Sequence, residues 1–466
     1  MAVKTFKRGL KLPTRKHATE GKPAETAPAP KQVVIPVNQH FGAPNKALVA
    51  VGDRVKRGQK IADAAGPGPM TAPVHASIAG VVKKIEPRTQ SNNTDGLCII
   101  IEADGTDETD FLPPLDIERC TKEEALARIR EAGIIGMGGA GFPSHVKLSP
   151  PPAKPIDLII ADGAECEPYL TTDEALLTEK TTLLIQGLAI VMKITGVNHA
   201  IIGMEDNKAR LIPMIETALA EVPHTGTIEI GLCKTRYPQG GEKMLITALT
   251  GREVPSGGLP MDAGCIVSNV GTLAAIAEAF TLGKPLIERG LTVSGGACKT
   301  PKNIHAPIGT LLTDLPPEFI DIDYGRLRKV LFGGPMMGTA VPTAAIPIQK
   351  NTSGIVLMTA EETYADAEGP CIRCARCLRN CACKLSPVLM NLALEAGDLD
   401  EAVKVGLMDC IECGSCTYVC PARIRLVQRF RVGKGRLRAR QALEMARQKA
   451  AEAAAKTAAS EPDKKI

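Results

Sequence analysis

The sequence predicts a multidomain protein of mixed class, in which an α/β domain is combined with β-rich modules and a small helical, cysteine-rich domain. Three observations lead to this prediction. The chain has 466 residues, more than one ordinary hydrophobic core contains. Apolar strands alternate with helices over residues 156–272, as in an open α/β sheet. Two cysteine runs of identical spacing lie near the end of the chain.

The composition narrows the class of protein. The longest apolar run, at residues 183–192, is too short to span a bilayer. The first 30 residues carry charge but lack the apolar core of a signal peptide, so we expect no secretory signal. The 15 cysteines then favour a reducing compartment. With no Trp and 3% aromatic residues, surfaces on which bases could stack are scarce, so nucleic acid is not an expected partner.

The first hundred residues divide into a polar segment and a strand-rich module. Residues 1–30 are polar and rich in Pro and Ala, which predicts a flexible segment. Residues 31–105 contain V-G-D-x-V-x-x-G-Q from Val51 and A-P-V-x-A-x-x-A-G-x-V from Ala72. These two halves resemble a biotinyl/lipoyl-type barrel-sandwich hybrid. The tip between them, residues 65–70, has no lysine, so the resemblance implies the fold without the carrier function.

Residues 106–285 are predicted to form a Rossmann-like α/β domain. Thr121 and Glu124 make a capping box for a helix that ends at Gly133. A glycine loop follows this helix, whereas the usual dinucleotide-binding loop follows a strand. Glycines still let backbone N–H groups approach a phosphate or a flat ring closely. Strands are expected at residues 156–161, 200–204 and 228–232, and ligands bind where such strands end.

The last third of the chain begins with strands and ends with a basic helix. Residues 286–362 are strand-like, and residues 291–315 resemble a soluble-ligand-binding β-grasp (SLBB) module, which we interpret as a spacer. Residues 421–440 hold eight Lys or Arg and no acid, which fits an anionic membrane surface or an acidic partner. A nucleic-acid-binding arm is the competing interpretation. Residues 433–466 are rich in Ala and basic residues and predict an exposed helix or tail.

The two cysteine runs predict a helical domain with two [4Fe–4S] clusters over residues 363–432. Both runs have the spacing C-x2-C-x2-C-x3-C, which is the ligand run of bacterial two-cluster ferredoxins. In that pattern the fourth cysteine of each run binds the other cluster. The predicted ligands are Cys371, Cys374, Cys377 and Cys420 for one cluster, and Cys381, Cys410, Cys413 and Cys416 for the other.

Two other uses of these cysteines fit less well, and one alternative stays open. Zinc sites take two C-x2-C pairs, and a disulfide framework needs a small chain in an oxidising compartment. The proline expected after Cys381 is replaced by Ala382, and Cys383 follows. A register shift in which Cys383 is the bridging ligand therefore remains an alternative.

Four motifs in the α/β domain occur in an order that is typical of one protein family. They are G-x-G-G-A-G-F-P from Gly136, E-x-E-P from Glu165, Y-x-x-G-G-E from Tyr237 and N-V-x-T from Asn269. This order resembles the flavin-binding subunit of respiratory NADH dehydrogenase (complex I). With the N-terminal module and the doubled cysteine run, residues 31–432 resemble more closely the C subunits of the Rnf ion-translocating electron transport complexes.

The resemblance implies FMN and NAD(H) in the α/β domain. Phe142 would stack on the adenine, Lys147 would lie near phosphate, and no catalytic residue beyond the cofactors is expected. Ala164 and Cys166 depart from complex I subunits, which carry Asp and Gly there. Without the resemblance, a solvated loop for the E-x-E pair and a helix N-terminal charge for Glu242 would serve equally well. The implied cofactor-binding residues are Gly136, Gly138, Gly139, Gly141, Phe142, Lys147, Asp162, Glu165, Glu167, Tyr237, Gly240, Gly241, Glu242, Asn269 and Thr272.

The resemblance also implies a function, a ferredoxin:NAD+ oxidoreductase subunit. NADH delivers two electrons as a hydride, each cubane accepts one, and a flavin handles both. The implied partners are the membrane and peripheral subunits of an Rnf-type complex, the membrane surface and, indirectly, ferredoxin. H+ or Na+ would move through partner subunits, and the chain would lie peripherally on the cytoplasmic side of the inner membrane. The competing class is a non-catalytic iron–sulfur wire or scaffold with a vestigial α/β domain.

Overall fold

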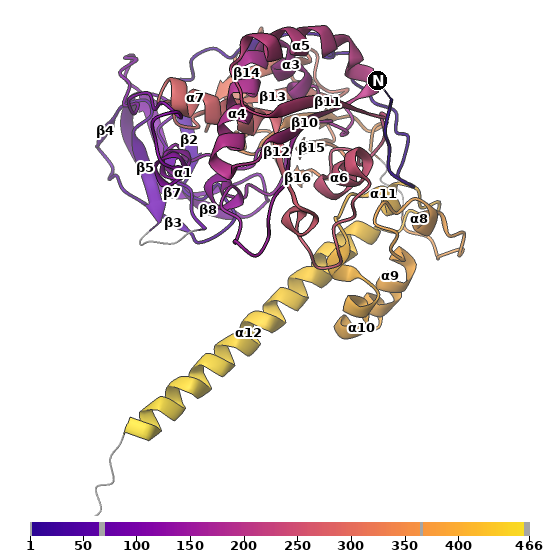
Figure 1. Ribbon diagram of the computed structural model, residues 1–466. Helices are drawn as coiled ribbons and strands as arrows, with labels where there is room; N and C mark the ends of the chain where they lie inside the picture. The colour runs from indigo at the N-terminus through magenta and orange to yellow at the C-terminus, as the bar shows by residue number, and fades with distance from the viewer. Residues whose placement is uncertain (1, 65–69, 364–366, 461–466) are drawn as a thin grey trace, which may run out of the picture. The chain divides into compact units, whose positions relative to one another are not determined.

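A computed structural model describes residues 2–64, 70–363 and 367–460. The chain forms two compact units, Met1–Ala365 and Asp366–Ile466 (Figure 1). Among the described residues, no single helix has the length and apolar character needed to cross a membrane. One helix pair bent by 91°, Thr172–Glu179 with Thr181–Thr195, passes that test on length and composition alone.

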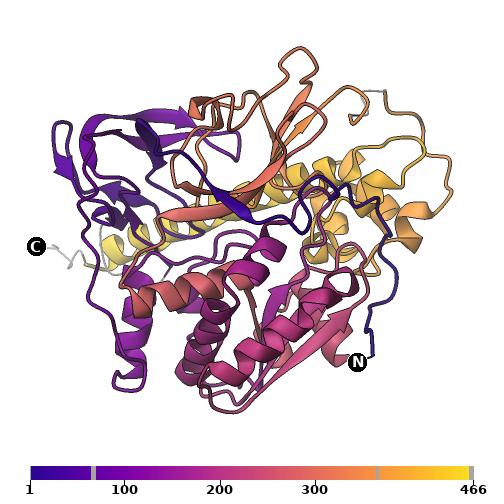
Figure 2. The same cartoon turned by 90° about the horizontal axis from the view of Figure 1, so that it is seen from above.

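The prediction of a flexible segment at residues 1–30 is wrong. Its strand β1 (Ala24–Thr26) pairs in parallel with β14 (Lys302–Pro307), and Figure 2 shows the indigo segment running beside the strands of that sheet. Phe6 and Leu10 are buried. The burial of Phe6, Leu10 and Ala27 in the first unit offsets the cost of ordering this polar stretch.

The strand-rich N-terminal module consists of two small antiparallel sheets that share one apolar core. Val33, Ile35, Ile61 and Ile99 are fully buried in that core. Apart from Met70, the lysine-free tip lies outside the described residues. One sheet has the order β2 (Gln32–Pro36), β8 (Asp95–Ala103), β7 (Gly80–Thr89), β4 (Arg54–Val55), and the other β3 (Asn45–Ala47), β5 (Lys60–Ala64), β6 (Val74–His75).

The α/β domain is built on a parallel four-stranded sheet with helices on both faces. Ile159 and Ala161 face one core, and the alternate residues Leu158 and Ile160 face the other, as expected of a strand buried on both sides. The capping box at Thr121 is confirmed for helix α1 (Lys122–Glu131). The sheet order is β11 (Thr227–Cys233), β10 (His199–Glu205), β9 (Leu158–Gly163), β12 (Cys265–Asn269).

The helices of this domain follow the strands. The first core includes α4 and α7, which pack on each other, together with α5, whereas the second core includes α6. The helices are α2 (Ser144–Lys147), α3 (Thr172–Glu179), α4 (Thr181–Thr195), α5 (Ile212–Glu221), α6 (Glu242–Thr250) and α7 (Val270–Thr281).

A mixed six-stranded sheet completes the first unit. Its core contains Leu291, Ile304, Ile355 and Leu357. The order is β1, β14, β13 (Glu288–Ser294), β17 (Gly354–Met358), β15 (Lys329–Phe332), β16 (Thr339–Val341).

The second unit is helical, and its last helix is longer than predicted. Helix α12 (Leu426–Ser460) begins inside the core of the unit, where Leu426 and Phe430 are buried. The predicted boundary at residue 433 is therefore wrong, because the helix runs through it without a break. Residues 441–452 are exposed. The other helices are α8 (Arg376–Arg379), α9 (Pro387–Glu395), α10 (Leu399–Lys404) and α11 (Ser415–Tyr418).

Candidate functional site

The carboxyl ends of the parallel strands gather several of the predicted residues. The register places Asp162 of β9 opposite Asn269 of β12. The Asn269 side chain accepts a hydrogen bond from Gly271 N at 2.9 Å and so caps α7. Its Nδ2 donates to Asp173 Oδ2 at 2.9 Å. A strand end, a helix start and a neighbouring acid thus meet at one point.

The glycine loop lies directly on this point. Met137 N donates to Thr272 Oγ1 at 3.0 Å. A Cβ added to Gly138 would lie 3.1 Å from Asn269 Cβ, so a larger residue there requires the neighbour to move. The structure therefore brings together Gly138 of the glycine loop, Asp162 at the end of β9, and Asn269 and Thr272 of the N-V-x-T motif.

The loop itself closes as a tight turn. Gly136 N donates to Phe142 O at 2.8 Å. Gly141 adopts φ 71°, a left-handed conformation that favours glycine. Residues 138–140 are exposed, and a Cβ at Gly139 would meet nothing within 4 Å. The backbone N–H groups of these residues are therefore accessible to a ligand.

The two glutamates of the E-x-E motif are anchored to backbone. Glu165 Oε1 accepts from Asp173 N at 2.9 Å, at the start of α3. Glu167 accepts from Met336 N at 3.0 Å and from Met337 N at 2.8 Å, in the loop after β15. Both glutamates are half-buried. The alternative of a freely solvated loop does not hold, because each carboxylate organises a neighbouring segment.

The Y-x-x-G-G-E motif packs against distant parts of the chain. Tyr237 is buried and pairs with Leu10 through two backbone hydrogen bonds, 2.7 and 2.8 Å long. A Cβ at Gly240 would lie 3.4 Å from Cys166 Sγ. Gly241 is the N-cap of α6. Glu242 opens that helix and forms an ion pair with Lys147, so the predicted helix N-terminal charge and the predicted phosphate-binding lysine are neighbours.

Three buried cations below this edge were not predicted. Lys208 Nζ donates to Ala164 O at 2.9 Å and lies 3.6 Å from Glu205. Lys16 Nζ donates to Glu165 O at 2.6 Å. Arg289 Nε donates to Thr352 O at 2.9 Å, and its guanidinium also contacts Met137. No local pattern in the sequence marks these residues, since each is an ordinary Lys or Arg until the chain folds over it.

The pKa values of the acids at this edge are strongly perturbed. Burial raises the pKa of Asp162 to about 8. Burial, reinforced by the charge of Glu165, raises the pKa of Asp173 to about 7, and burial raises that of Glu167 to about 7. A substantial share of these carboxyl groups is therefore protonated at neutral pH. A proton on a buried carboxyl removes its charge and supplies a hydrogen-bond donor.

The site fits a phosphorylated flavin in its chemistry. The start of α7 lies beside the accessible amides of the glycine loop, and helix N-termini favour anions. Because burial raises the pKa values of Asp162, Asp173 and Glu167, these acids repel a phosphate less than fully ionised ones would. Gln239 is fully buried, and both polar atoms of its side chain lack a hydrogen-bond partner among the described residues. Such groups are normally satisfied in a native protein, so a ligand or water is expected beside it.

In the second unit the cysteines form two groups. The thiol of Cys377 has Cys374 and Cys420 as electrostatic neighbours. The thiol of Cys416 has Cys410, Cys413 and Cys381 as neighbours. The last cysteine of each run thus lies beside the other run, which agrees with the predicted crossing for Cys420 and Cys381. The full set of ligands stays a prediction.

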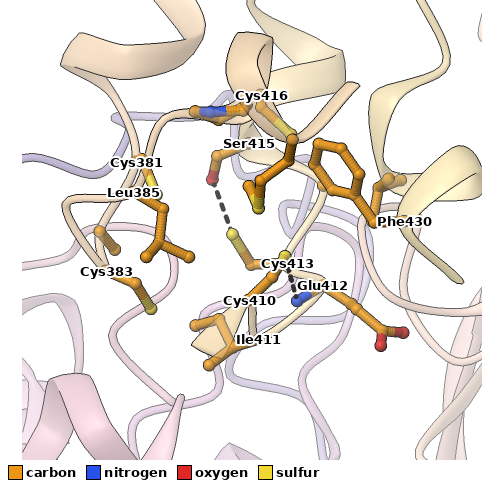
Figure 3. Close-up of a pocket in the computed structure, with 15 residues that line it drawn as sticks. Cys381, Cys383, Leu385, Cys410, Ile411, Glu412, Cys413, Ser415, Cys416 and Phe430 are labelled. Carbon is orange, nitrogen blue, oxygen red and sulfur yellow. Dashed lines mark hydrogen bonds between the residues drawn. The ribbon is translucent and has the colours of Figure 1, made fainter. Parts of the chain in front are cut away.

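A pocket lies at the second of these groups (Figure 3). Cys413 Sγ donates to Ser415 Oγ at 3.3 Å, and Glu412 N donates to Cys410 Sγ at 3.4 Å. Cys383 lines the same pocket, but the neighbours of Cys416 include Cys381, which favours the unshifted register. The pocket is lined by Cys381, Ala382, Cys383, Leu385, Pro387, Met390, Cys410, Ile411, Glu412, Cys413, Gly414, Ser415, Cys416, Val427 and Phe430.

These thiols fit iron–sulfur clusters better than a lone metal ion. Burial raises the pKa of Cys410 to about 11. A buried thiol of this kind stays protonated unless a metal takes the place of its proton. Four grouped sulfurs in a water-poor pocket are the donor set that a cubane requires.

Three protein-family models match the chain. The RnfC barrel sandwich hybrid domain matches residues 4–106, the Nuo51 FMN-binding domain residues 129–278, and the 4Fe-4S dicluster domain residues 342–424. The match of the first model from residue 4 agrees with the ordered N-terminal segment. Fold and sites together define a flavin and iron–sulfur electron-transfer protein.

Curated relatives narrow this class. The chain is 45% identical to the C subunit of the proton-translocating ferredoxin:NAD(+) oxidoreductase complex of Clostridium ljungdahlii, over 94% of this chain and 95% of the relative. It is 40% identical to the C subunit of the Na(+)-translocating complex of Acetobacterium woodii, over 92% and 96%. The chain belongs to the family of C subunits of ion-translocating ferredoxin:NAD(+) oxidoreductase complexes, the Rnf complexes.

Among solved structures the likeness is distant. The crystal structure of an NAD+-reducing [NiFe]-hydrogenase in the H2-reduced state matches with a TM-score of 0.48 and 22% identity, over 66% of this chain and 61% of that chain. The same kind of enzyme in the air-oxidized state matches with a TM-score of 0.47 and 21% identity, over 67% and 63%.

Proposed function

We propose that this chain is the peripheral, NADH-side subunit of a membrane-bound ion-translocating ferredoxin:NAD+ oxidoreductase complex. In it, electrons pass between NAD(H), FMN and two [4Fe–4S] clusters. The observation that carries the proposal is the presence in one chain of a glycine loop seated on a parallel-sheet edge and of two crossed cysteine groups. Bound FMN exchanges two electrons with NAD(H) as a hydride and single electrons with clusters.

In this proposal the residues of the sheet edge bind and orient the nucleotides. The exposed amides of residues 138–140 and the start of α7 hold phosphate. Lys147, which pairs with Glu242, lies five residues after the loop and would turn to the phosphate when it binds. Asn269 and Thr272 keep the loop in place through the contacts described above. The full proposed set is Gly136, Gly138, Gly139, Gly141, Phe142, Lys147, Asp162, Glu165, Glu167, Tyr237, Gly240, Gly241, Glu242, Asn269 and Thr272.

Asp162 has a more specific proposed role. Burial raises the pKa of this carboxyl to about 8, so the carboxyl keeps its proton at lower pH. A protonated carboxyl at the strand end can donate a hydrogen bond to a flavin or nicotinamide oxygen, which an ionised one cannot. Lys16 and Lys208 place positive charge beside Glu165 and Glu205, which reduces the repulsion of phosphates at this edge.

The two cysteine groups are the proposed cluster ligands. One cluster is assigned to Cys371, Cys374, Cys377 and Cys420, and the other to Cys381, Cys410, Cys413 and Cys416. The backbone amide of Glu412 and the hydroxyl of Ser415 lie against two of these sulfurs, and such hydrogen bonds tune the reduction potential of a cluster.

We assign the remaining parts of the chain to positioning the electron-transfer cofactors within the complex. We assign residues 286–362 to an SLBB-type β-grasp spacer, supported by the mixed sheet and its place between the flavin-type domain and the cluster unit in sequence. Within the basic residues 421–440, Arg429, Arg431, Lys434 and Arg440 pair with acids of the same unit. The exposed Arg423, Arg425, Arg436 and Arg438 would face anionic lipid or a neighbouring Rnf subunit on the cytoplasmic side of the inner membrane. Ferredoxin would act through those partners, and they would move H+ or Na+.

One experiment separates this function from a passive iron–sulfur scaffold. The chain is purified anaerobically, its flavin and iron are quantified, and it is titrated with NADH. We expect bound flavin, two clusters and NADH-driven bleaching of the cluster absorbance. Two clusters without flavin and without bleaching would mean that the chain is only a wire or scaffold.

A further inference from the structure

The beginning of the chain runs along the carboxyl edge of the parallel sheet. We call residues 4–19 the N-terminal strap. Lys4 pairs in parallel with Cys233, the last residue of β11, and Leu10 pairs in antiparallel fashion with Tyr237 of the Y-x-x-G-G-E motif. The strap precedes the strand-rich N-terminal module in the sequence, yet these contacts are made with the α/β domain.

The N-terminal strap also holds both ends of the E-x-E loop, residues 165–169. Lys16 Nζ donates to Glu165 O at 2.6 Å, and Thr14 O accepts from Tyr169 N at 2.9 Å. Glu165 and Tyr169 have φ 46° and 69°, in the left-handed region that side chains other than glycine rarely adopt. Such a conformation costs free energy and persists only where surrounding contacts hold it. The two strained residues of this loop are the two that the strap contacts.

Lys16 brings a buried cation to a loop that has none of its own. The loop contains two acids and no basic residue, and Lys16 is only 2% exposed. Burial, reinforced by the charge of Lys208, lowers the pKa of Lys16, whereas Glu165 and Glu205 oppose this and favour the charged form. A lysine is almost never this deeply buried without partners, so the position of its ammonium group is tightly specified.

We propose that the N-terminal strap is part of the flavin site, and that Lys16 is a positioning residue that sets the affinity and the reduction potential of the bound flavin. This inference rests on the proposed FMN site in the α/β domain. The strap fixes the E-x-E loop relative to the Y-x-x-G-G-E motif, so flavin binding does not carry the entropic cost of ordering them. A buried positive charge nearby favours the reduced flavin, because reduction adds negative charge to the ring.

The first test compares Lys16→Met with Lys11→Met in the full chain. Met keeps the apolar stem of Lys16 and removes its ammonium group, and Lys11 is an exposed lysine of the same strap. The flavin-free chain is titrated with FMN, and the midpoint potential of the bound flavin is then measured. In Lys16→Met we expect the Kd of FMN to rise about tenfold and the potential to become more negative. Neither should change in Lys11→Met.

The second test moves the strap without altering charge. Gly9 has φ 75°, and a Cβ added there would lie 2.5 Å from Tyr237 O, so Gly9→Ala displaces the strap from the Y-x-x-G-G-E motif. Gly52→Ala is the matched control, because Gly52 has φ 96° and its Cβ would meet nothing within 4 Å. Both variants strain the backbone, but only Gly9→Ala should weaken FMN binding.

The outcomes are distinguishable. Wild-type values of both the Kd and the potential in Lys16→Met would refute the inference, and a higher Kd without a shift in potential would refute the role assigned to Lys16. Iron content reports on folding of each variant. If Lys16→Met does not fold, equal FMN affinity of Gly9→Ala and Gly52→Ala would refute the role of the strap. A wild-type chain that does not bind FMN would instead refute the proposed function.

Discussion

The flavin-type site of the first unit and the cysteine groups of the second are assembled in contrasting ways. The former draws on residues from Lys16 to Arg289, each making up to three hydrogen bonds. The latter draws on two short runs, residues 371–381 and 410–420. A site of many weak contacts loses function gradually as contacts are removed. A cluster needs all four of its thiolates, so the loss of one ligand removes the cluster. The expected effects of substitutions should therefore fall steeply from the cysteine groups to the flavin-type site.

The largest effect is expected at the cysteine groups. Cys413→Ser removes one of four ligands, and we expect iron to fall from about eight to about four atoms per chain, with loss of one cluster signal in paramagnetic resonance. Cys383→Ser is the matched control, because Cys383 lines the same pocket without being a proposed ligand. Unaltered cluster signals in Cys413→Ser, or loss of a cluster in Cys383→Ser, would contradict the assignment.

A smaller effect is expected at the glycine loop. In Gly138→Ala the new methyl group would press on Asn269, whereas in Gly139→Ala it would meet open space. Both variants should raise the KM of NADH, by about tenfold, because a methyl group blocks approach to the backbone. Only Gly138→Ala should also lower the free energy of unfolding of the flavin-free chain, by about 1–2 kcal/mol, because the added methyl group overpacks this position. Equal melting of the two flavin-free variants would show that the close contact with Asn269 is not a constraint.

A moderate, pH-dependent effect is expected at Asp162. Its folded-state pKa of about 8 lies above the unfolded value of ~3.9, so the folded chain binds a proton that the unfolded chain has lost. The stability contributed by this proton is fully present below about pH 4 and is lost as the pH rises through about 8. Asp162→Asn cannot titrate.

The difference in melting temperature between Asp162→Asn and the wild type should therefore shift in favour of the variant between pH 5.5 and 8.5, by at least ~2 °C. Scanning calorimetry of the two proteins at both pH values measures it. Lys350, whose pKa burial lowers to about 7, has the opposite pH dependence but is present in both proteins and cancels. Parallel melting curves across this range would mean that Asp162 titrates normally.

The smallest effect is expected at the far end of α12. Truncation after Arg440 removes a stretch whose described side chains are exposed, and keeps the ion pair between Arg440 and Asp400. Iron content should stay the same, and the second unit should lose less than ~1 kcal/mol of stability. Iron loss on truncation would show that this stretch belongs to the core of the unit.

Much of the fold was predictable from local patterns. The apolar runs at residues 156–161, 200–204 and 228–232 became β9, β10 and β11, and Thr121 with Glu124 capped α1 as expected. The errors concern segments with weak local signals. Residues 1–30 are mostly polar, yet Phe6, Leu10 and Lys16 are buried against the rest of the first unit. The tail boundary failed because Leu426 and Phe430 belong to the same helix as the exposed stretch.

The sequence by itself predicted the cluster chemistry, because three proposed ligands of each cluster come from one short run and their spacing is a covalent property of the chain. It also determined the order of the nucleotide-binding motifs. Only the tertiary structure decided which groups surround them. The burial that raises the pKa of Asp162, the cations Lys16, Lys208 and Arg289 beneath it, and the approach of Phe41 to Phe142 all depend on contacts between residues far apart in sequence. Desolvation and stacking are set by such packing, and no local spacing encodes them.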